Sequence, residues 1–425
     1  MKNHCKVLLL ILLAAMMLSG CVMMTVDELY CLPKRSQADD DMQAVIDHAM
    51  TGLSYCAPIY GQNRQMVQPA DLDGDGSDEY VVLGRDSARK QLRILIIDQF
   101  VLGYELTDTI QGYGAAFDFI EFADVDGYPG AEIVVGRQVG DGSVCSVAVY
   151  RYENGKTHQL LEAAYSKFLT FDLDEDGRSE LLAIHPAEAG NVTSNAVLYR
   201  YEDGRIHRAA QLEVSVSAGN VTRMEQVTLQ DGTNAVLVVS EESNSQIMEL
   251  LAFQSGHLKH VYGPAMVYRL RDHFIYPMDV DSDGDIDLPE ILPMQGKESE
   301  DAWIIWFGVD GQGRRVNGMY TYYSYASKWY IHVDRDWINK LVVTHTGGIC
   351  TFNNQNGQMV MTIYTLTGPD RKEQAQQLGG VVLGSSETIT FVATVGPGAE
   401  ALGISEQRVK QLFYAINLKL YTEEA

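Results

Sequence analysis

The sequence predicts a mainly β fold that is built from a repeated unit of about fifty residues. Four acidic segments can be superimposed on one another, and they begin at Asp71, Asp124, Asp172 and Asp279. A fainter copy begins at about residue 227 and has lost most of its carboxylates. The steps between the five starting positions are 53, 48, 55 and 52 residues. Self-similarity at such a period is typical of a repeat architecture in which each unit is one supersecondary module.

The residues around each acidic segment predict short strands. An apolar run follows each segment, as at 80–83 and 181–184, and an alternating run such as 146–152 comes later in the unit. Asn154-Gly155 and Asp203-Gly204 are dipeptides typical of tight hairpins. Each unit therefore holds about four strands, and repeated four-stranded units of this length are typical of propeller blades. We expect residues 61–325 to form a β-propeller of about five blades.

The acidic segments have the residue types and the spacing of calcium-binding loops. Calcium takes six to eight oxygen ligands. Acids at positions 1, 3 and 5 can point at one centre, glycine at position 6 permits a sharp turn, position 7 offers its carbonyl, and an acid at position 9 completes the shell. The predicted ligands are Asp71, Asp73, Asp75, the Ser77 carbonyl and Glu79; Asp172, Asp174, Asp176, the Arg178 carbonyl and Glu180; and Asp279, Asp281, Asp283, the Asp285 carbonyl and Asp287. The second loop has only the weaker set of Asp124, Asp126 and Glu132, because Tyr128 replaces a ligand.

These loops differ from EF-hands. An EF-hand places a glutamate at position 12, on a helix that follows the loop. The first and third loops have Val82 and Ala183 there, and the fifth has Glu290 directly after Pro289, which argues against a helix. An Asx-type turn without metal is the alternative. Because three acids within five residues repel one another unless a cation lies between them, structural calcium is the expected cofactor.

The loops also carry a family resemblance. The pattern D-x-D-x-D-G-x-x-[DE] before an apolar strand resembles the FG-GAP or VCBS repeat of integrin-α-like propellers, over roughly 60–65% of the chain. The Phe-Gly and Gly-Ala-Pro landmarks of that repeat are not recognisable, the second unit has lost a ligand, and the fourth is nearly bare. The resemblance implies a calcium-binding propeller, and these departures bear on the number of blades.

Residues 1–20 have the features of an export signal. Lys2 and Lys6 precede an apolar run at 7–17, which is shorter than the ~20 residues of a membrane-spanning helix. Leu18-Ser19-Gly20-Cys21 resembles a bacterial lipobox, which implies that Cys21 is lipidated. An ordinary signal peptide or a short anchor helix is the alternative. We expect a lipoprotein of the bacterial cell envelope that is exported, anchored to the membrane by its lipid, and faces outside the cytoplasm.

Two segments flank the repeats. Residues 21–60 are expected to form a tether with a short helix at about 39–53, because Met42, Val45, Ile46, Ala49 and Leu53 recur at helical spacing. This helix is expected to pack at the propeller edge. Residues 326–425 are expected to form a small α+β domain, with five strands and a helix that begins after Ser405 and has an apolar stripe through Val409, Leu412, Phe413 and Ile416.

Charge and cysteine content exclude several classes of protein. The chain has 57 acidic and 32 basic residues and a net charge of −25, which argues against a nucleic-acid partner because phosphates require a basic face. Cys31, Cys56, Cys145 and Cys350 show no CxxC spacing, which excludes a zinc ribbon or a thioredoxin-like pair. Whether Cys31 and Cys56 form a disulfide is left open.

The sequence favours a binding or scaffolding protein over an enzyme. It contains no HExxH or GxSxG motif and no GxGxxG motif, so no catalytic group stands out. The expected partners are the membrane, through the lipid, and a surface protein or polysaccharide. The aromatic residues between 320 and 330 either stack on such a ligand or fill the seam before the C-terminal domain. The alternative function is a calcium-dependent polysaccharide-active enzyme.

Overall fold

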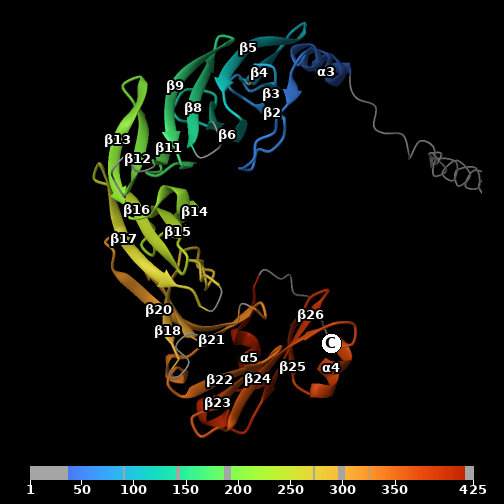
Figure 1. Ribbon diagram of the computed structural model, residues 1–425, viewed down its shortest axis with the longest axis vertical. Helices are drawn as coiled ribbons and strands as arrows, with labels where there is room; N and C mark the ends of the chain where they lie inside the picture. Colours follow the sequence, from blue (N-terminus) through green and yellow to red (C-terminus); the bar gives the residue numbers. More distant parts are fainter. Residues whose placement is uncertain are drawn as a thin grey trace, which may run out of the picture.

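Figure 1 shows the computed structural model of the protein as an open arc of β-sheets that follow one another in chain order. The structure describes residues 37–89, 91–139, 144–185, 193–270, 273–294, 302–324 and 326–416. The predicted signal at 1–20, the lipidation site Cys21, the first part of the tether, and Cys31 lie outside these ranges. Within them, no helix combines the length and the apolar character that a membrane span requires.

The first four sheets are antiparallel, and in each of them consecutive strands are neighbours. The first contains β2 (Val67–Ala70), β3 (Glu79–Asp86), β4 (Gln91–Phe100) and β5 (Gly103–Tyr113), with the two-residue β1 (Ser54–Tyr55) at its edge. The second contains β6 (Ala116–Ala123), β7 (Glu132–Val139), β8 (Val144–Glu153) and β9 (Lys156–Tyr165). The third contains β10 (Lys167–Phe171), β11 (Glu180–His185), β12 (Ser194–Glu202) and β13 (Arg205–Val214). The fourth contains β14 (Val221–Thr228), β15 (Asn234–Glu241), β16 (Ser245–Gln254) and β17 (His257–Tyr268). The predicted mainly β fold and its four-stranded units are confirmed.

The last two sheets are less regular. The fifth contains β18 (Leu288–Pro293), β19 (Ala302–Val309), β20 (Arg315–Ser324), β21 (Trp329–Val333) and β27 (Phe413–Ala415). The sixth contains β22 (Leu341–Thr346), β23 (Ile349–Asn354), β24 (Met359–Thr367), β26 (Ile389–Val395) and β25 (Val381–Ser385). The helices are α3 (Gln37–Ala49), α4 (Arg371–Leu378) and α5 (Glu406–Leu412), with 3-10 turns η1 (Ala218–Asn220), η2 (Arg335–Trp337) and η3 (Glu400–Leu402).

Alternating side chains stack the sheets face to face. In β7, Ile133 and Val135 lie in the core shared with the first sheet, whereas Val134 lies in the core shared with the third. In β11, Leu181 contacts the core of the second sheet and Leu182 that of the fourth. Successive residues of a strand point to opposite faces, so a fully apolar run serves two neighbouring sheets. This explains why the second strand of each unit has no polar alternation.

The arc does not close on itself in Figure 1. The remaining face of the first sheet, which includes Val82 and Leu95, is covered by Ile46 of α3 and by Met50, the residue that follows the helix. At the other end, Trp303 and further aromatic residues of the fifth sheet share a core with the sixth sheet. The predicted N-terminal helix therefore covers the outer face of the first sheet, at one end of the arc. A propeller closes by packing its last blade on its first, and here α3 occupies the face that such a contact would use.

The tight turns have the predicted geometry. Asn154 and Gly155 have φ values of 53° and 76°, and Asp203 and Gly204 have 52° and 82°. Two consecutive positive φ angles are the signature of the type I′ turn that joins twisted hairpin strands. These turns connect the third and fourth strands of the second and third sheets.

The C-terminal region is interlocked with the fifth sheet. The expected domain start at 326 lies between β20 and β21, which are neighbouring strands of one sheet, and β27 then pairs with β21. The predicted helix does begin after Ser405, whose hydroxyl accepts a hydrogen bond from the Arg408 amide. It ends at Leu412, because the chain returns as β27 to cover the end of the fifth sheet.

The aromatic residues between 320 and 330 mainly fill this seam. Tyr322 and Trp329 are 2% and 0% exposed in the core that joins the fifth and sixth sheets. The ring of Tyr330 stacks on that of Tyr414 of β27, with the centroids 5.1 Å apart. Of the two uses considered from the sequence, Tyr322, Trp329 and Tyr330 serve packing, and Tyr325 lies outside the described residues.

The covering role of α3 can be tested with Ile46→Ala. This side chain is 1% exposed, and removal of a buried isoleucine costs about 2–5 kcal/mol of unfolding free energy. We expect urea denaturation to show a loss in this range. His48→Ala on the exposed side of the same helix is the control, and it should shift the midpoint little. Equal midpoints for both variants would contradict the covering role.

Candidate metal centres in the interstrand loops

The acidic segments occupy equivalent places in successive sheets. Residues 71–78 join β2 to β3, residues 124–131 join β6 to β7, and residues 172–179 join β10 to β11, so each connects the first strand of a sheet to its second. The fifth acidic loop precedes β18. In place of a first strand, a single β-bridge joins Met278 to Asp287. The repeat found in the sequence is therefore a structural repeat of this hairpin.

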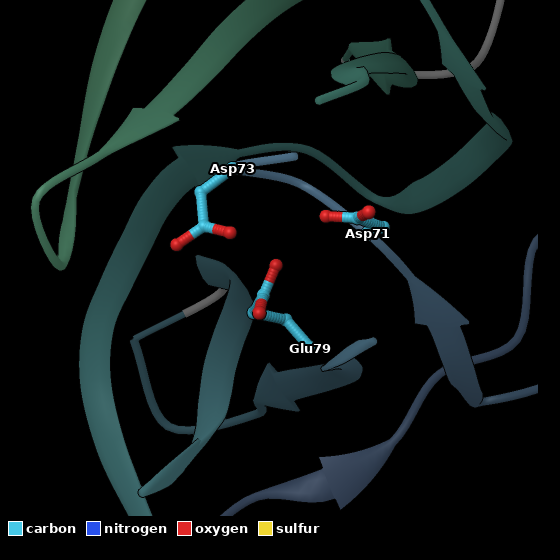
Figure 2. Close-up of side chains that lie close together, drawn as sticks. All are labelled: Asp71, Asp73 and Glu79. Carbon is cyan, nitrogen blue, oxygen red and sulfur yellow. The ribbon is translucent and has the colours of Figure 1, made fainter. Parts of the chain in front are cut away.

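The structure brings three carboxylates together in each of four loops. Oxygen atoms of the acids at positions 1, 3 and 9 all lie within 4.8 Å of one another. Figure 2 shows this convergence for the first loop. The four sets are Asp71, Asp73 and Glu79; Asp124, Asp126 and Glu132; Asp172, Asp174 and Glu180; and Asp279, Asp281 and Asp287. Among the described residues, the fourth repeat contributes no such set, as its sequence predicts.

The acid at position 9 is fixed by the loop that it closes. In the first loop, Oε2 of Glu79 accepts a hydrogen bond of 2.7 Å from the amide of Leu72 at position 2. The same bond recurs in the other three loops, from Val125 to Glu132, from Leu173 to Glu180 and from Val280 to Asp287. All four acids are at most 7% exposed. The acid stands at the start of a core strand, and this hydrogen bond uses only one of its two carboxylate oxygens.

The acid at position 1 organises the turn. Its two oxygens accept bonds from loop amides, which in the first loop are those of Gly74 at 2.7 Å and Gly76 at 3.1 Å. The glycine at position 6 has a φ of 89° in the first loop, 88° at Gly177 and 95° at Gly284. Side chains rarely adopt this conformation, so the glycine is required at that place, as the sequence predicts.

The acid at position 5 is not grouped with the other three. Asp75 and Asp283 accept hydrogen bonds from the amides of Ser77 and Asp285, two residues further on. Asp176 likewise accepts from the amide and the guanidinium of Arg178. The position-5 carboxylates therefore shape the turn in the structure. Their role as ligands, and that of the carbonyls of Ser77, Arg178 and Asp285, remains a prediction.

Burial and mutual repulsion oppose ionisation of the clustered acids. Burial, reinforced by nearby carboxylates, raises the pKa of Glu79 to about 7 and that of Glu132 to about 8. The same causes raise the pKa values of Glu180 and Asp287 to about 6. A cluster of this kind without a counter-charge is unfavourable near neutral pH, and a divalent cation held between the oxygens would remove that cost.

Two arginines that the sequence reasoning did not identify lie in the second and third clusters. Arg151 of β8 forms ion pairs with Asp126 and Glu132. Arg200 of β12 pairs with Asp174 at 2.6 Å and with Glu180 at 3.2 Å. The signal that could have found them is the repeated Tyr-Arg-Tyr-Glu at 150–153 and 199–202, which puts an arginine at the same place in two consecutive units.

Neighbouring loops are joined by backbone hydrogen bonds. The amide at position 8 of one loop donates to the carbonyl at position 1 of the loop before it: Ala131 to Asp71 at 3.1 Å, Ser179 to Asp124 at 2.7 Å, and Ile286 to Thr228 at 3.0 Å. The approach is close, because a Cβ added to Gly130 would lie 2.3 Å from the Leu72 carbonyl oxygen. The conformation of each loop therefore affects its neighbour in the next sheet.

Comparisons with known proteins add little to this geometry. No protein-family model matches the chain, and no curated protein matches it. Among solved structures, the chain is similar to the rhamnogalacturonan lyase YesW, with a TM-score of 0.31 and 12% sequence identity over 65% of this chain and 60% of the lyase. The chain thus matches less than two thirds of that enzyme, and a likeness this distant supports no statement about function.

The raised pKa values predict how the metal-free protein responds to pH. Glu79 has an ordinary pKa of 4.5 and a folded value of about 7, so the folded state favours its protonated form. Its contribution to stability is present below pH 4.5 and is lost as pH rises through about 7. In the presence of a chelator, we expect the melting temperature to fall between pH 5 and pH 8. Replacing Glu79 by Gln should flatten this dependence and Asp78→Asn should not, and a melting temperature that rises with pH would contradict the account.

Proposed function

We propose that the protein is a calcium-stabilised, propeller-type stack of FG-GAP/VCBS-like repeats that acts as a binding or scaffolding module at the bacterial cell envelope. The observation that carries the proposal is the recurrence of one carboxylate cluster at the same hairpin of four sheets. Export and attachment through a lipid on Cys21 belong to the proposal and rest on the sequence at 18–21. A surface protein or a polysaccharide is the proposed ligand.

Calcium is the metal that these donors favour. Each cluster consists of Asp and Glu oxygens alone, which suits a hard cation and excludes the nitrogen and sulfur ligands that zinc prefers. Calcium also tolerates an irregular shell, which a loop of nine residues can complete with carbonyls and water. Extracellular modules bind calcium at ~10⁻⁴–10⁻³ M, a range that suits an exported protein.

The position of the clusters supports a structural role for the metal. Each cluster lies within a hairpin whose backbone is hydrogen bonded to a neighbouring hairpin along the arc. An ion bound in the cluster stabilises the conformation of the loop that contains Asp71 or Asp279. It thereby contributes to the stacking of neighbouring sheets. A ligand that binds only the folded state stabilises it by mass action.

Removal of calcium should destabilise the protein. At ten times the dissociation constant, one ion adds about 1.4 kcal/mol to the unfolding free energy, so a chelator should lower the melting temperature by several degrees. The double variant Asp71→Asn with Asp73→Asn should lose part of the calcium-dependent shift. Asp78→Asn, an exposed neighbour in the same loop that lies outside the cluster, should keep it. Identical melts with calcium and with chelator would refute the structural role.

A calcium-dependent polysaccharide-active enzyme is the second candidate function. The observation that favours it is a cavity of about 700 Å³ beside the fifth loop, lined by Asp281, Asp287, Tyr320, His332 and Arg335 among others. Burial lowers the pKa of His332, so its neutral ring could accept a proton. If the protein is an enzyme, it should cleave a polysaccharide, and His332→Ala should abolish this cleavage while the variant still folds and binds calcium. Retention of a glycan on an array without cleavage supports the binding module.

A further inference from the structure

In each carboxylate cluster, one residue of the third strand lies directly opposite the acid at position 9, and the four clusters differ in the charge of that residue. In the second sheet Ile133 pairs with Tyr150, so the next residue, Arg151, lies opposite the position-9 acid Glu132. In the third sheet Leu181 pairs with Tyr199, which puts Arg200 opposite Glu180. This position on the third strand will be called the facing position. From this position a base enters the second cluster and the third.

The first and fifth clusters have no base at the facing position. Tyr80 pairs with Ile97, so the facing residue of the first cluster is Asp98. Leu288 pairs with Phe307, so that of the fifth cluster is Gly308. The facing residues of the four clusters are thus acidic, basic, basic and uncharged. The carboxylate of Asp98 is close enough to repel the charge of Glu79 and contributes to its raised pKa.

Arg151 is held between its acids. Its guanidinium contacts Asp126, whose side chain is 0% exposed, and lies 3.9 Å from Glu132. It also donates a hydrogen bond of 2.9 Å to the Tyr201 hydroxyl and lies over the ring of Tyr128 at 4.7 Å. Tyr128 is the residue that replaces the position-5 ligand. The lost carboxylate and the gained arginine therefore belong to one arrangement.

Arg200 holds the third cluster in the same way. It contacts the acids at positions 3, 5 and 9, with 2.6 Å to Asp174, 3.7 Å to Asp176 and 3.2 Å to Glu180. Its guanidinium also lies 5.3 Å from the ring of Phe253. The carboxylate of Asp176 is in addition paired with Arg178. Oxygens of Asp174, Asp176 and Glu180 are therefore already paired with cations of the chain.

We propose that Arg151 and Arg200 take the place of calcium in the second and third clusters, so that the chain binds two calcium ions, at the first and fifth clusters. This inference rests on the proposed calcium-stabilised stack and deepens it. A guanidinium is charged at all physiological pH values and presents planar donors that match carboxylates, so it neutralises the cluster without depending on the calcium concentration. The third loop then holds its shape without the ion that its sequence predicts.

Equilibrium dialysis of the full mature protein against radioactive calcium tests the inference. At a calcium concentration about ten times the weakest expected dissociation constant of ~10⁻³ M, and with salt to screen the acidic surface, we expect two ions per chain. Asp71→Asn with Asp73→Asn should lower the number to one, and so should Asp279→Asn with Asp281→Asn.

The arginine variants give the opposite change. Arg151→Ala and Arg200→Ala should each raise the number of bound ions to three, and the double variant to four. Arg205→Ala, an exposed arginine on β13, is the control and should leave it at two. If an arginine variant fails to fold, Asp98→Arg serves the same purpose, because it puts an arginine at the facing position of the first cluster and should lower the number to one.

The outcomes separate this inference from the proposal beneath it. Two ions in the unaltered protein, with the stated changes in the variants, support the arginine substitution. Three or four ions in the unaltered protein, or arginine variants that bind no further calcium, overturn it and leave the calcium-stabilised stack intact. The absence of bound calcium from the unaltered protein overturns the calcium-stabilised stack itself, and the arginine inference with it.

Discussion

The stack depends on the hydrogen bond by which each acidic loop donates an amide to the carbonyl of the loop before it. For the amides of Ala131 and Ser179 that carbonyl belongs to the acid at position 1, whose side chain also organises its own turn, and for Ile286 it belongs to Thr228 of the fourth repeat. Closely spaced carboxylates repel one another, and a cation among them would relieve this repulsion. The charge of a cluster and the contact between neighbouring sheets are therefore linked, because both depend on the conformation of the same loop.

The rest of the arc follows from face-to-face packing. Each sheet contacts its two neighbours through alternate residues of the same strands, as Ile133 and Val134 show. A chain of units with nearest-neighbour contacts resembles a solenoid, whose end units need a cover. Here α3 covers one end through Ile46, and the sixth sheet shares a core with the fifth at the other. The covers let the stack remain open, and they separate the two ends that a closed ring would join.

Much of this organisation could be predicted from the sequence because it depends on local patterns. The period of about fifty residues, the apolar strand after each loop, the glycine at position 6 and the type I′ turns are all properties of short segments. The acids at positions 1, 3 and 9 were also identified, since a nine-residue loop brings them together without help from the rest of the chain.

Features that depend on distant segments could not be predicted in the same way. Arg151 and Arg200 reach the clusters only through strand register, which depends on hairpins that the sequence pattern does not fix. The return of 413–415 to the fifth sheet turns the end of an expected helix into a strand. The α4 helix at Arg371–Leu378 buries only Ala375, so no apolar stripe marks it. The α3 helix packs on the sheet face that no other sheet covers. Which face this is depends on how all the sheets are stacked in the arc.

Hydrogen exchange at the amides that join the loops tests the central claim most directly. The amide of Ala131 donates to the first loop and that of Ile286 belongs to the fifth, and the clusters of these two loops have no base at the facing position. The amide of Ser179 joins the second and third loops, whose clusters contain Arg151 and Arg200. The account predicts that replacing calcium with a chelator speeds exchange at Ala131 and Ile286 and leaves Ser179 and the core strand amides slow. Exchange at all three amides that is the same with and without calcium would contradict the claim that a bound cation holds the sheets together through these loops.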